Sequence, residues 1–292
     1  MICDSHCHFF STKFFQTLKP GPHPAATLGW DAPGTPEELA DRWIGELDKH
    51  SVARAALIAS VPGDEDSVAA AVARHPSRFV GYFMVDPTRD DAVMRTVATL
   101  ERPGMRTVCL FPAMQRYSLH DERVMRVIQA VKVHAGAAIF VHCGVLSVGV
   151  RTKLGLPSNF DIRFGNPLDL HELATEFPNL PFIIPHFGAG MLREALMVAD
   201  LCPNIFLDTS SSNRWMRYLP GVTLKDVFRQ ALAVLGPERL LFGSDSSFFP
   251  RGWVRTVLED QLLVVPDTAA PGIFSGNFDR IFPATSSQSL AG

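Results

Sequence analysis

The sequence is short of the features that mark membrane, secreted and nucleic-acid-binding proteins. No stretch approaches the roughly 20 consecutive apolar residues of a membrane-spanning helix. The first residues show neither the basic segment nor the apolar core of a secretory signal. Lys and Arg number 27 against 30 Asp and Glu, so no basic surface for nucleic acid or anionic lipid is expected. We therefore expect a small-molecule partner and no nucleic-acid or membrane partner, with a homo-oligomer left open.

Cysteine is scarce and shows none of the spacings typical of a disulfide framework or a zinc site. The chain has 5 cysteines, an odd number, and no Cys-x-x-Cys pair. A complete disulfide framework is excluded, because such frameworks use an even number. Cys3 and Cys7 have no second cysteine pair with which to build a zinc knuckle. The sequence predicts reduced thiols and a cytoplasmic protein.

What the sequence does have is a regular alternation of short apolar runs and amphipathic segments. Continuous apolar runs are typical of strands buried on both faces of a parallel sheet. The runs lie at residues 1–3, 52–60, 79–85, 107–111, 137–142, 181–186, 204–208 and 239–245. Eight strand–helix units in 292 residues predict an α/β protein with a single (β/α)8 TIM barrel, regular or distorted. A doubly wound open sheet is the alternative, but no Gly-x-Gly-x-x-Gly phosphate loop favours it.

Helix signals fill the gaps between these runs. Thr35 is the predicted N-cap of a helix over 35–50, with Pro36 in its first turn and Glu38 closing a capping box. Further helices are predicted at 66–76, 90–100, 121–136, 167–177, 190–201, 223–235 and 277–282.

The predicted domain organisation is one barrel with two long loops. Residues 1–283 show one composition regime, and residues 284–292 form a polar C-terminal tail. Two connections are longer than a tight strand-to-helix loop, at 9–34 after the first strand and at 143–166 after the fifth. Loops that follow barrel strands form the active-site face. We expect both long loops to border a substrate site.

Residues that suit metal binding stand where the predicted strands end. His6 and His8, in DSHCH, share one face of a strand, with Cα atoms roughly 6.6 Å apart, so their imidazoles can share one ion. His142, His186 and Asp245 close three later apolar runs. The C-terminal ends of barrel strands converge on one mouth. The other 6 of the 10 histidines fall in predicted helices or loops, where a structural role suffices.

These motifs, taken in order, resemble the amidohydrolase superfamily, and specifically its amidohydrolase-related family of aminocarboxymuconate-semialdehyde decarboxylase-like metal-dependent hydrolases. The resemblance covers nearly the whole chain and includes DSHCHFF, FVHCG, PHFG and LLFGSD. It implies that His6, His8, His142 and Asp245 bind a divalent metal and that His186 acts beside it on water or substrate. Many members hold a second metal on a carboxylated lysine of strand four. Here that strand offers Cys109, so one metal is expected.

The predicted ligand set defines the chemistry we expect. Three imidazoles and a carboxylate with an open position suit catalytic zinc, while manganese, iron and cobalt remain alternatives. Asp245 would accept a proton from water, and His186 would orient that water or stabilise oxyanion charge. The predicted function is hydrolysis of an amide, ester or lactone in a small carboxylated molecule. The alternative is non-oxidative decarboxylation of an aromatic or unsaturated acid, and a barrel with a purely structural ion is a third reading.

Further polar residues have two readings each. Asp4 lies on the same strand face as His6 and either orients a histidine or caps backbone groups. Asp208 either lines the mouth or simply ends its strand. Several basic loop residues either clamp a substrate carboxylate or keep the surface soluble. They are Arg151, Lys153, Arg163 and Arg214.

Overall fold

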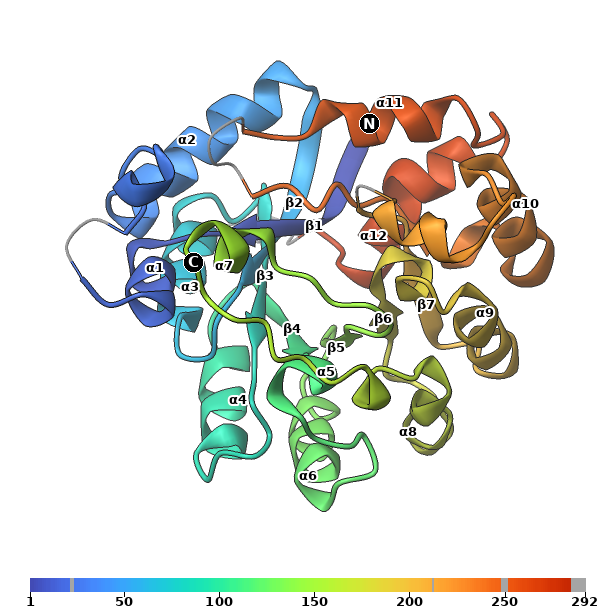
Figure 1. Cartoon of the computed structure of the whole chain (residues 1–292), viewed down its shortest axis with the longest axis horizontal. Helices are drawn as coiled ribbons and strands as arrows, with labels where there is room; N and C mark the ends of the chain where they lie inside the picture. The colour runs from blue at the N-terminus through green and yellow to red at the C-terminus, as the bar shows by residue number, and fades with distance from the viewer. Residues whose placement is uncertain (22–23, 212, 248–251, 285–292) are drawn as a thin grey trace, which may run out of the picture.

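The computed structural model describes residues 1–21, 24–211, 213–247 and 252–284. The predicted polar tail therefore lies outside the described residues from residue 285 onward. Eight parallel strands pair in chain order, so that each strand neighbours the next (Figure 1). The strands are β1 (Ile2–Phe9), β2 (Val52–Ala59), β3 (Phe79–Met84), β4 (Met105–Leu110), β5 (Ala138–Val141), β6 (Phe182–Ile184), β7 (Ile205–Asp208) and β8 (Leu240–Leu241). The predicted (β/α)8 barrel is confirmed.

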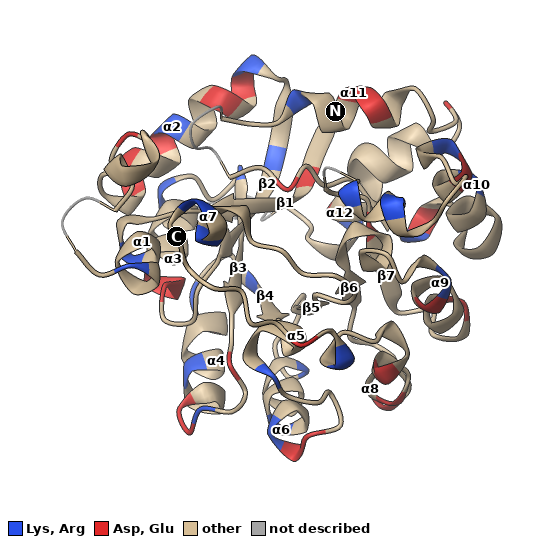
Figure 2. Cartoon of the chain, viewed as in Figure 1, with Lys and Arg blue, Asp and Glu red and all other residues tan. Residues whose placement is uncertain are grey.

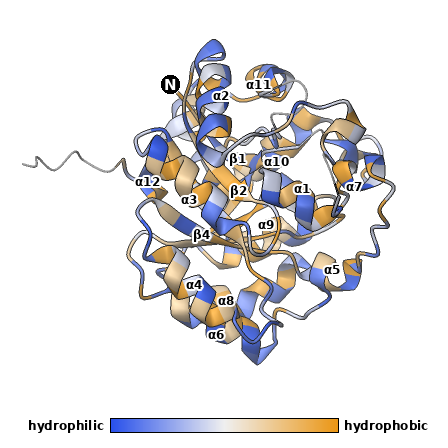
Figure 3. Ribbon diagram, turned by 90° about the vertical axis from the view of Figure 1, so that its left-hand side faces the viewer, coloured by the Kyte–Doolittle hydropathy of each residue, from blue (hydrophilic) through white to orange (hydrophobic). Residues whose placement is uncertain are grey.

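Helices surround this sheet as an outer layer. They are α1 (Thr12–Leu18), α2 (Pro36–Lys49), α3 (Glu65–Arg74), α4 (Ala92–Leu100), α5 (Pro112–Gln115), α6 (Glu122–Val131), α7 (Gly149–Lys153), α8 (Leu170–Glu176), α9 (Leu192–Leu201), α10 (Leu224–Leu235), α11 (Arg255–Leu262) and α12 (Asn277–Ile281). Short helical turns are η1 (Ala26–Leu28), η2 (Ile162–Phe164), η3 (Pro167–Asp169), η4 (Pro185–Gly188), η5 (Arg214–Tyr218), η6 (Pro237–Arg239) and η7 (Gly272–Gly276). Helices such as α3 and α4 carry both hydrophobic and hydrophilic residues, as a layer packed on one face requires (Figure 3).

The last strand closes the barrel onto the first one. The backbone N–H of Ser5 donates to the carbonyl of Phe242 at 2.8 Å, and that of Asp245 donates to the carbonyl of His6 at 2.9 Å. The segment that follows β8 therefore runs directly beside the two histidines of β1. This closure places His6 and Asp245, which are 239 residues apart in the sequence, next to one another.

The capping prediction for α2 is confirmed, because the Thr35 hydroxyl accepts from the Glu38 backbone N–H while the Glu38 carboxylate accepts from that of Thr35. Other boundaries differ from the sequence reading. β1 extends well beyond the predicted residues 1–3 and carries the histidines itself. The helix predicted over 121–136 ends at Val131.

Four helices lie where none was predicted. α1 and α7 lie inside the two long connections, α5 directly follows β4, and α11 follows the closing segment. All four are short, from four to eight residues, so their sequences hold too few turns for a clear helical period. Among the described residues, no helix combines the length and apolar character needed to cross a membrane. All five cysteines are buried and free of disulfides, as predicted.

The barrel interior is filled by an apolar cluster of its own. Tyr82, Cys109 and Phe140 are fully buried there, each from a different strand. Cys109 therefore packs as a small apolar side chain at the strand-four position where the resemblance expects a lysine in two-metal proteins. The interior of the barrel is a packed core, and polar side chains gather at its mouth.

Candidate metal centre

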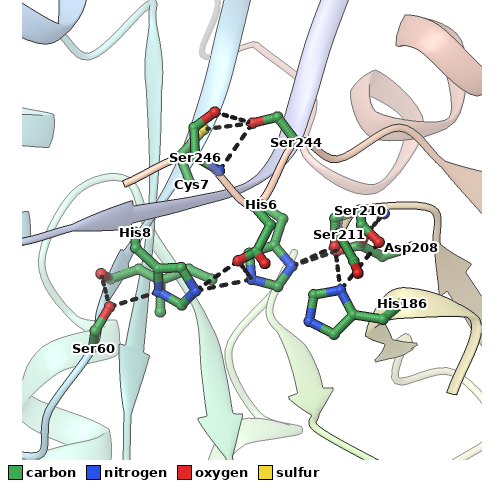
Figure 4. Close-up of polar contacts among 12 residues, drawn as sticks. His6, Cys7, His8, Ser60, His186, Asp208, Ser210, Ser211, Ser244 and Ser246 are labelled. Atoms are coloured by element: carbon green, nitrogen blue, oxygen red, sulfur yellow. Dashed lines mark hydrogen bonds and ion pairs between the residues drawn. The ribbon is translucent and has the colours of Figure 1, made fainter. Parts of the chain in front are cut away.

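The two histidines of β1 and the aspartate after β8 meet at one point. The Nε2 atoms of His6 and His8 lie 3.3 Å apart (Figure 4). Asp245 Oδ1 lies 3.1 Å from His8 Nε2 and 3.6 Å from His6 Nε2. The structure thus brings these three predicted ligands within reach of a single ion.

The tautomer of His6 follows from its partner on β7. His6 Nδ1 lies 2.8 Å from Asp208 Oδ2, and both side chains are fully buried. An ionised carboxylate only accepts hydrogen bonds, so His6 Nδ1 carries the proton. His6 Nε2 is left with its lone pair directed at His8 and Asp245. Asp208, for which two readings were open, therefore orients a predicted metal ligand.

His8 is held in the same way by a serine at the end of β2. The Ser60 hydroxyl donates to the carbonyl of Ile58 at 3.1 Å, so it accepts from His8 Nδ1, which lies 2.7 Å away. The Nε2 lone pair of His8 is therefore also open toward the site. Two lone pairs facing one another at 3.3 Å repel unless a cation lies between them, which is the chemical signature of a metal site.

His186 reaches the site from a strained turn and not from the strand end that the sequence predicts. β6 ends at Ile184, and His186 lies in η4 with a φ of 57°. Its Nδ1 lies 3.1 Å from the carbonyl of Ser210, which can only accept, so Nε2 again holds the lone pair. One ligand atom each of His6, His186 and Asp245 lies within 4.8 Å of the others.

His142 lies one ring farther from this cluster. Its imidazole is buried, with its centroid 5.2 Å from that of His186, and it stacks on Phe111 at 5.5 Å. His142 Nδ1 is buried and has no hydrogen-bond partner among the described residues. An orphaned nitrogen at this place fits a missing ligand, because buried polar atoms are otherwise paired. The tight group of ligand atoms therefore includes His186, with the predicted ligand His142 directly beside it.

The charge of the site fits a cation. Burial alone would raise the pKa of Asp245, but the adjacent His8 and the nearby His186 and His6 hold it well below its usual value. Burial lowers the pKa of His142 and His186, which favours the neutral form of both rings. Burial also acts to lower the pKa of His6, but the adjacent Asp208 and Asp245 outweigh it, so that the pKa is raised. A cation bound beside Asp245 would take the place of that proton, because carboxylate and imidazole groups are ligands of divalent metals.

The remaining contacts explain the local sequence. Asp4 accepts from the backbone N–H groups of His6 and Ser244, both at 3.0 Å, and from the indole of Trp253, so it caps backbone groups and orients no histidine. A Cβ at Gly243 would lie 2.7 Å from Asp208 Oδ1 and 3.0 Å from His6 Cβ. Only glycine lets these two side chains pack, which accounts for the glycine in FGSD. Sequence reasoning missed Ser60 and Ser210, whose only signal is a hydroxyl residue just after a strand.

The residues of the candidate metal centre line a cavity of about 540 Å³. Its walls come from the two long loops that were predicted to border it, including Phe10 and Trp30 from the first and Val148 and Lys153 from the second. In Figure 1 the segment that carries α7 crosses in front of the barrel strands. A space of this size holds a small organic molecule.

Comparison with known proteins places this architecture in a family. A family model described as amidohydrolase matches residues 3–284. Among curated proteins, protein fluG of Emericella nidulans is 25% identical over 169 residues. This match covers 57% of the chain but only 18% of that relative's length.

Three solved structures share the fold at low sequence identity. The 5-carboxyvanillate decarboxylase from Sphingomonas paucimobilis has a TM-score of 0.65 at 15% identity, over 97% of this chain and 99% of that chain. The enzyme of that name from Novosphingobium aromaticivorans, complexed with manganese, has a TM-score of 0.66 at 14% identity, over 97% and 96%. A probable 2-pyrone-4,6-dicarboxylic acid hydrolase from Acinetobacter baumannii has a TM-score of 0.63 at 16% identity, over 96% and 98%. Since the family model spans nearly the whole chain, the protein belongs to the amidohydrolase family.

Proposed function

We propose that the protein is a metal-dependent hydrolase that cleaves an amide, ester or lactone bond in a small carboxylated substrate. The observation that carries the proposal is the convergence of the Nε2 lone pairs of His6, His8 and His186 and of the Asp245 carboxylate on one cavity. The single metal would be held by His6, His8, Asp245 and the adjacent His142, whose buried Nδ1 lacks a hydrogen-bond partner among the described residues. His186 would then act on water beside the metal. A divalent ion bound there would lower the pKa of a bound water to about 7 and so supply hydroxide at neutral pH.

The nitrogen and oxygen donor set leaves the metal open between zinc and its neighbours. Zinc is our first expectation, because three imidazoles, a carboxylate and an open position suit a catalytic zinc site. Manganese, iron and cobalt accept the same donors. The manganese in the Novosphingobium decarboxylase supports manganese as the second choice.

Asp245 is proposed to carry the proton through the reaction. Its carboxylate lies beside the ligand atoms of His6 and His8, so it is placed to accept a proton from the attacking water. It would then donate this proton to the departing group as the bond breaks. Its φ of 60° places it in the left-handed region, where an aspartate is held only by the structure around it.

His186 is proposed to orient the attacking water. With its Nδ1 proton bound to the carbonyl of Ser210, its Nε2 can only accept a hydrogen bond while the ring is neutral. Burial keeps the pKa of His186 lowered, which favours this neutral form. The water-orienting role is therefore favoured over that of an oxyanion donor, which needs a proton on Nε2.

Decarboxylation of an aromatic acid is the second candidate. Phe111 stacks on His142, and Phe10 lies with its ring centroid 5.7 Å from that of His8. These flat walls suit an aromatic ring next to the metal ligands. Two of the similar structures are decarboxylases of a carboxylated aromatic compound, which supports keeping this reaction in view.

One experiment separates these reactions. The purified protein, stripped with a chelator and reloaded with zinc or manganese, is given a panel of N-acyl amino acids, lactones and hydroxybenzoic acids, while acid release and CO₂ are both followed. Metal-dependent acid release without CO₂ is the expected result. CO₂ release without bond hydrolysis would overturn the hydrolase in favour of the decarboxylase. A chain that unfolds on chelation and turns over nothing when reloaded would instead support a purely structural ion.

A further inference from the structure

A second cavity, of about 640 Å³, opens onto the same metal centre. It shares three predicted site residues with the first cavity, His142, His186 and Asp245. Ser147, just before α7, and Gly149 and Lys153, the two end residues of α7, line both cavities. The metal centre therefore lies at a junction, with the loop after β5 as the partition between two lobes.

The first lobe is aromatic and apolar. Phe10 and Phe14 line it and stack with their ring centroids 4.1 Å apart and their planes within 3°. Phe111 and Met114 form part of the wall after β4. Such a surface binds an aryl or alkyl group by burying it. The basic residues of this lobe, Arg151 and Lys153, both lie on α7, and Arg151 donates to the carbonyl of Pro157 at 2.7 Å.

The second lobe is basic. Lys153, Arg214 and Arg217 line it, and Asp245 is the only carboxylate among its described lining residues. None of the three cations forms an ion pair with a described carboxylate. Figure 2 shows basic residues on α7 at this end of the barrel. Arg217 is positioned by its neighbour, because its Nη2 donates to the hydroxyl of Tyr218 at 2.7 Å.

A buried donor in the same lobe also lacks a partner. Trp215 lines the second lobe between the two arginines in sequence and is only 5% exposed. Its indole Nε1 is buried and has no hydrogen-bond partner among the described residues. A buried N–H without an acceptor is unfavourable, so an acceptor supplied by a ligand would stabilise the complex.

We infer that the substrate is two-ended, with an apolar acyl or aryl group in the first lobe and a carboxylate in the second. Arg214 and Arg217 bind this carboxylate, Lys153 adds charge at the partition, and the Trp215 indole donates to the bound group. The scissile amide or ester then lies between the two ends, over the metal centre. This inference rests on the proposed function for the reacting bond, while the charge preference of the second lobe is a separate property.

Equilibrium binding tests the inference on the metal-loaded protein. The probes are N-benzoylglycine, N-hexanoylglycine and N-acetylglycine, each compared with its uncharged glycinamide by titration calorimetry. The acids are expected to bind about ten-fold or more tightly than the amides. The benzoyl and hexanoyl acids are expected to bind more tightly than the acetyl acid, because more apolar surface enters the first lobe.

Substitutions in the second lobe test which residues produce the preference for acids over amides. In the double variant Arg214→Met/Arg217→Met the acid and amide are expected to bind within about two-fold of each other. The matched control is Arg163→Met, in the same face of loops, since Arg163 is bonded to Asp161 and lines neither lobe. Its acid preference should equal that of the wild type. The inference is overturned by equal binding of acids and amides, by a preference that survives the double variant, or by no probe binding at millimolar concentration.

The two proposals fail in different ways. If the preference for acids depends on Arg214 and Arg217 but no probe is hydrolysed, the hydrolase proposal is rejected and carboxylate binding in the second lobe is supported. If the probes are hydrolysed while the KM for the acids is unchanged in Arg214→Met/Arg217→Met, carboxylate binding in the second lobe is rejected and the hydrolase proposal is supported.

Discussion

The two ends of the barrel differ in the kinds of side chain that they bury and in what those side chains do. At the N-terminal end, Phe278 and Phe282 of the α12 region pack against Cys3, while Arg54 pairs with Asp279. This end is apolar, with the Arg54–Asp279 ion pair across it. At the mouth, His6, His8 and His186 each have Nδ1 hydrogen-bonded and Nε2 left open. The comparison indicates that one end stabilises the fold and that the other is organised to bind.

Backbone conformation follows the same division. Six of the eight described non-glycine residues with positive φ lie in the segments that follow β6, β7 and β8. They are His186, Phe187, Ala189, Ser211, Asn213 and Asp245. Such conformations cost of order 1–3 kcal/mol each and persist where the surroundings enforce them. The strained backbone conformations are therefore concentrated at the mouth, and the packing of the core and of the closed end offsets their cost.

The largest effect is expected at the mouth, from His8→Ala. This change removes one imidazole from the ion, so we expect loss of the bound metal and a fall in kcat/KM of roughly a thousand-fold. Elemental analysis and the hydrolysis assay measure the two effects. His171→Ala, on the exposed side of α8, is the control and should keep both. A His8→Ala protein that retains a full equivalent of metal would contradict the ligand assignment.

The corresponding change at the closed end is Phe278→Ala. Phe278 is 1% exposed, so we expect the free energy of unfolding to fall by about 3–5 kcal/mol, because a cavity replaces the ring. Metal content and kcat/KM per folded chain should not change. Urea denaturation compares it with Leu263→Ala, where the side chain is 83% exposed and little change is expected. A loss of metal affinity in Phe278→Ala would contradict the claim that the closed end stabilises the fold without affecting metal binding at the mouth.

A smaller effect is expected from Asp208→Asn, which changes the residue that is hydrogen-bonded to His6. An amide no longer requires the proton on His6 Nδ1, so the open Nε2 lone pair is less well fixed. We expect metal affinity to fall by about 10–100-fold, measured by competition with a chelator. Asp279→Asn, which changes a carboxylate at the closed end, is the matched control. Equal metal affinities for the two variants would show that Asp208 has no role in orienting His6.

The smallest effect concerns a buried carboxyl on the mouth side. Burial raises the pKa of Asp64 from 3.8 to about 6, and the hydroxyls of Ser67 and Ser11 offset this only in part. The folded protein therefore holds this proton more tightly than the unfolded chain does. The contribution to stability is complete below the unfolded pKa and is lost as the pH rises through the folded pKa.

Asp64→Asn removes this titration. Relative to the wild type, the free energy of unfolding of the variant should rise by about 1–2 kcal/mol as the pH goes from about 4 to about 7. Urea denaturation at intervals of pH measures the difference. Parallel stability profiles for the two proteins would mean that the Asp64 carboxyl titrates normally in the fold.

The sequence predicts the fold and the gathering of polar groups because both depend on periodic or terminal patterns. Apolar runs at regular spacing identify the strands. Asp245 is recognisable because it ends such a run, and His6 and His8 because they are spaced two residues apart shortly after the first run. The N-cap of α2 is equally local: Thr35 and Glu38 are three residues apart.

What the sequence does not predict depends on contacts between distant segments. The His6 orientation comes from Asp208 and that of His8 from Ser60, partners 202 and 52 residues away. His186 is placed by a left-handed turn after a three-residue strand, a conformation that non-glycine residues adopt only uncommonly and that the apolar pattern of the sequence does not reveal. The relative order of His142 and His186 around the ion depends on that turn, so residue types alone do not fix it.

X-ray absorption spectroscopy of the purified protein, with elemental analysis of the same sample, is the most direct measurement of the central claim. The account predicts one divalent ion per chain with a shell of nitrogen and oxygen at about 2.0–2.2 Å. No bound ion, or a sulfur ligand near 2.3 Å, would contradict it.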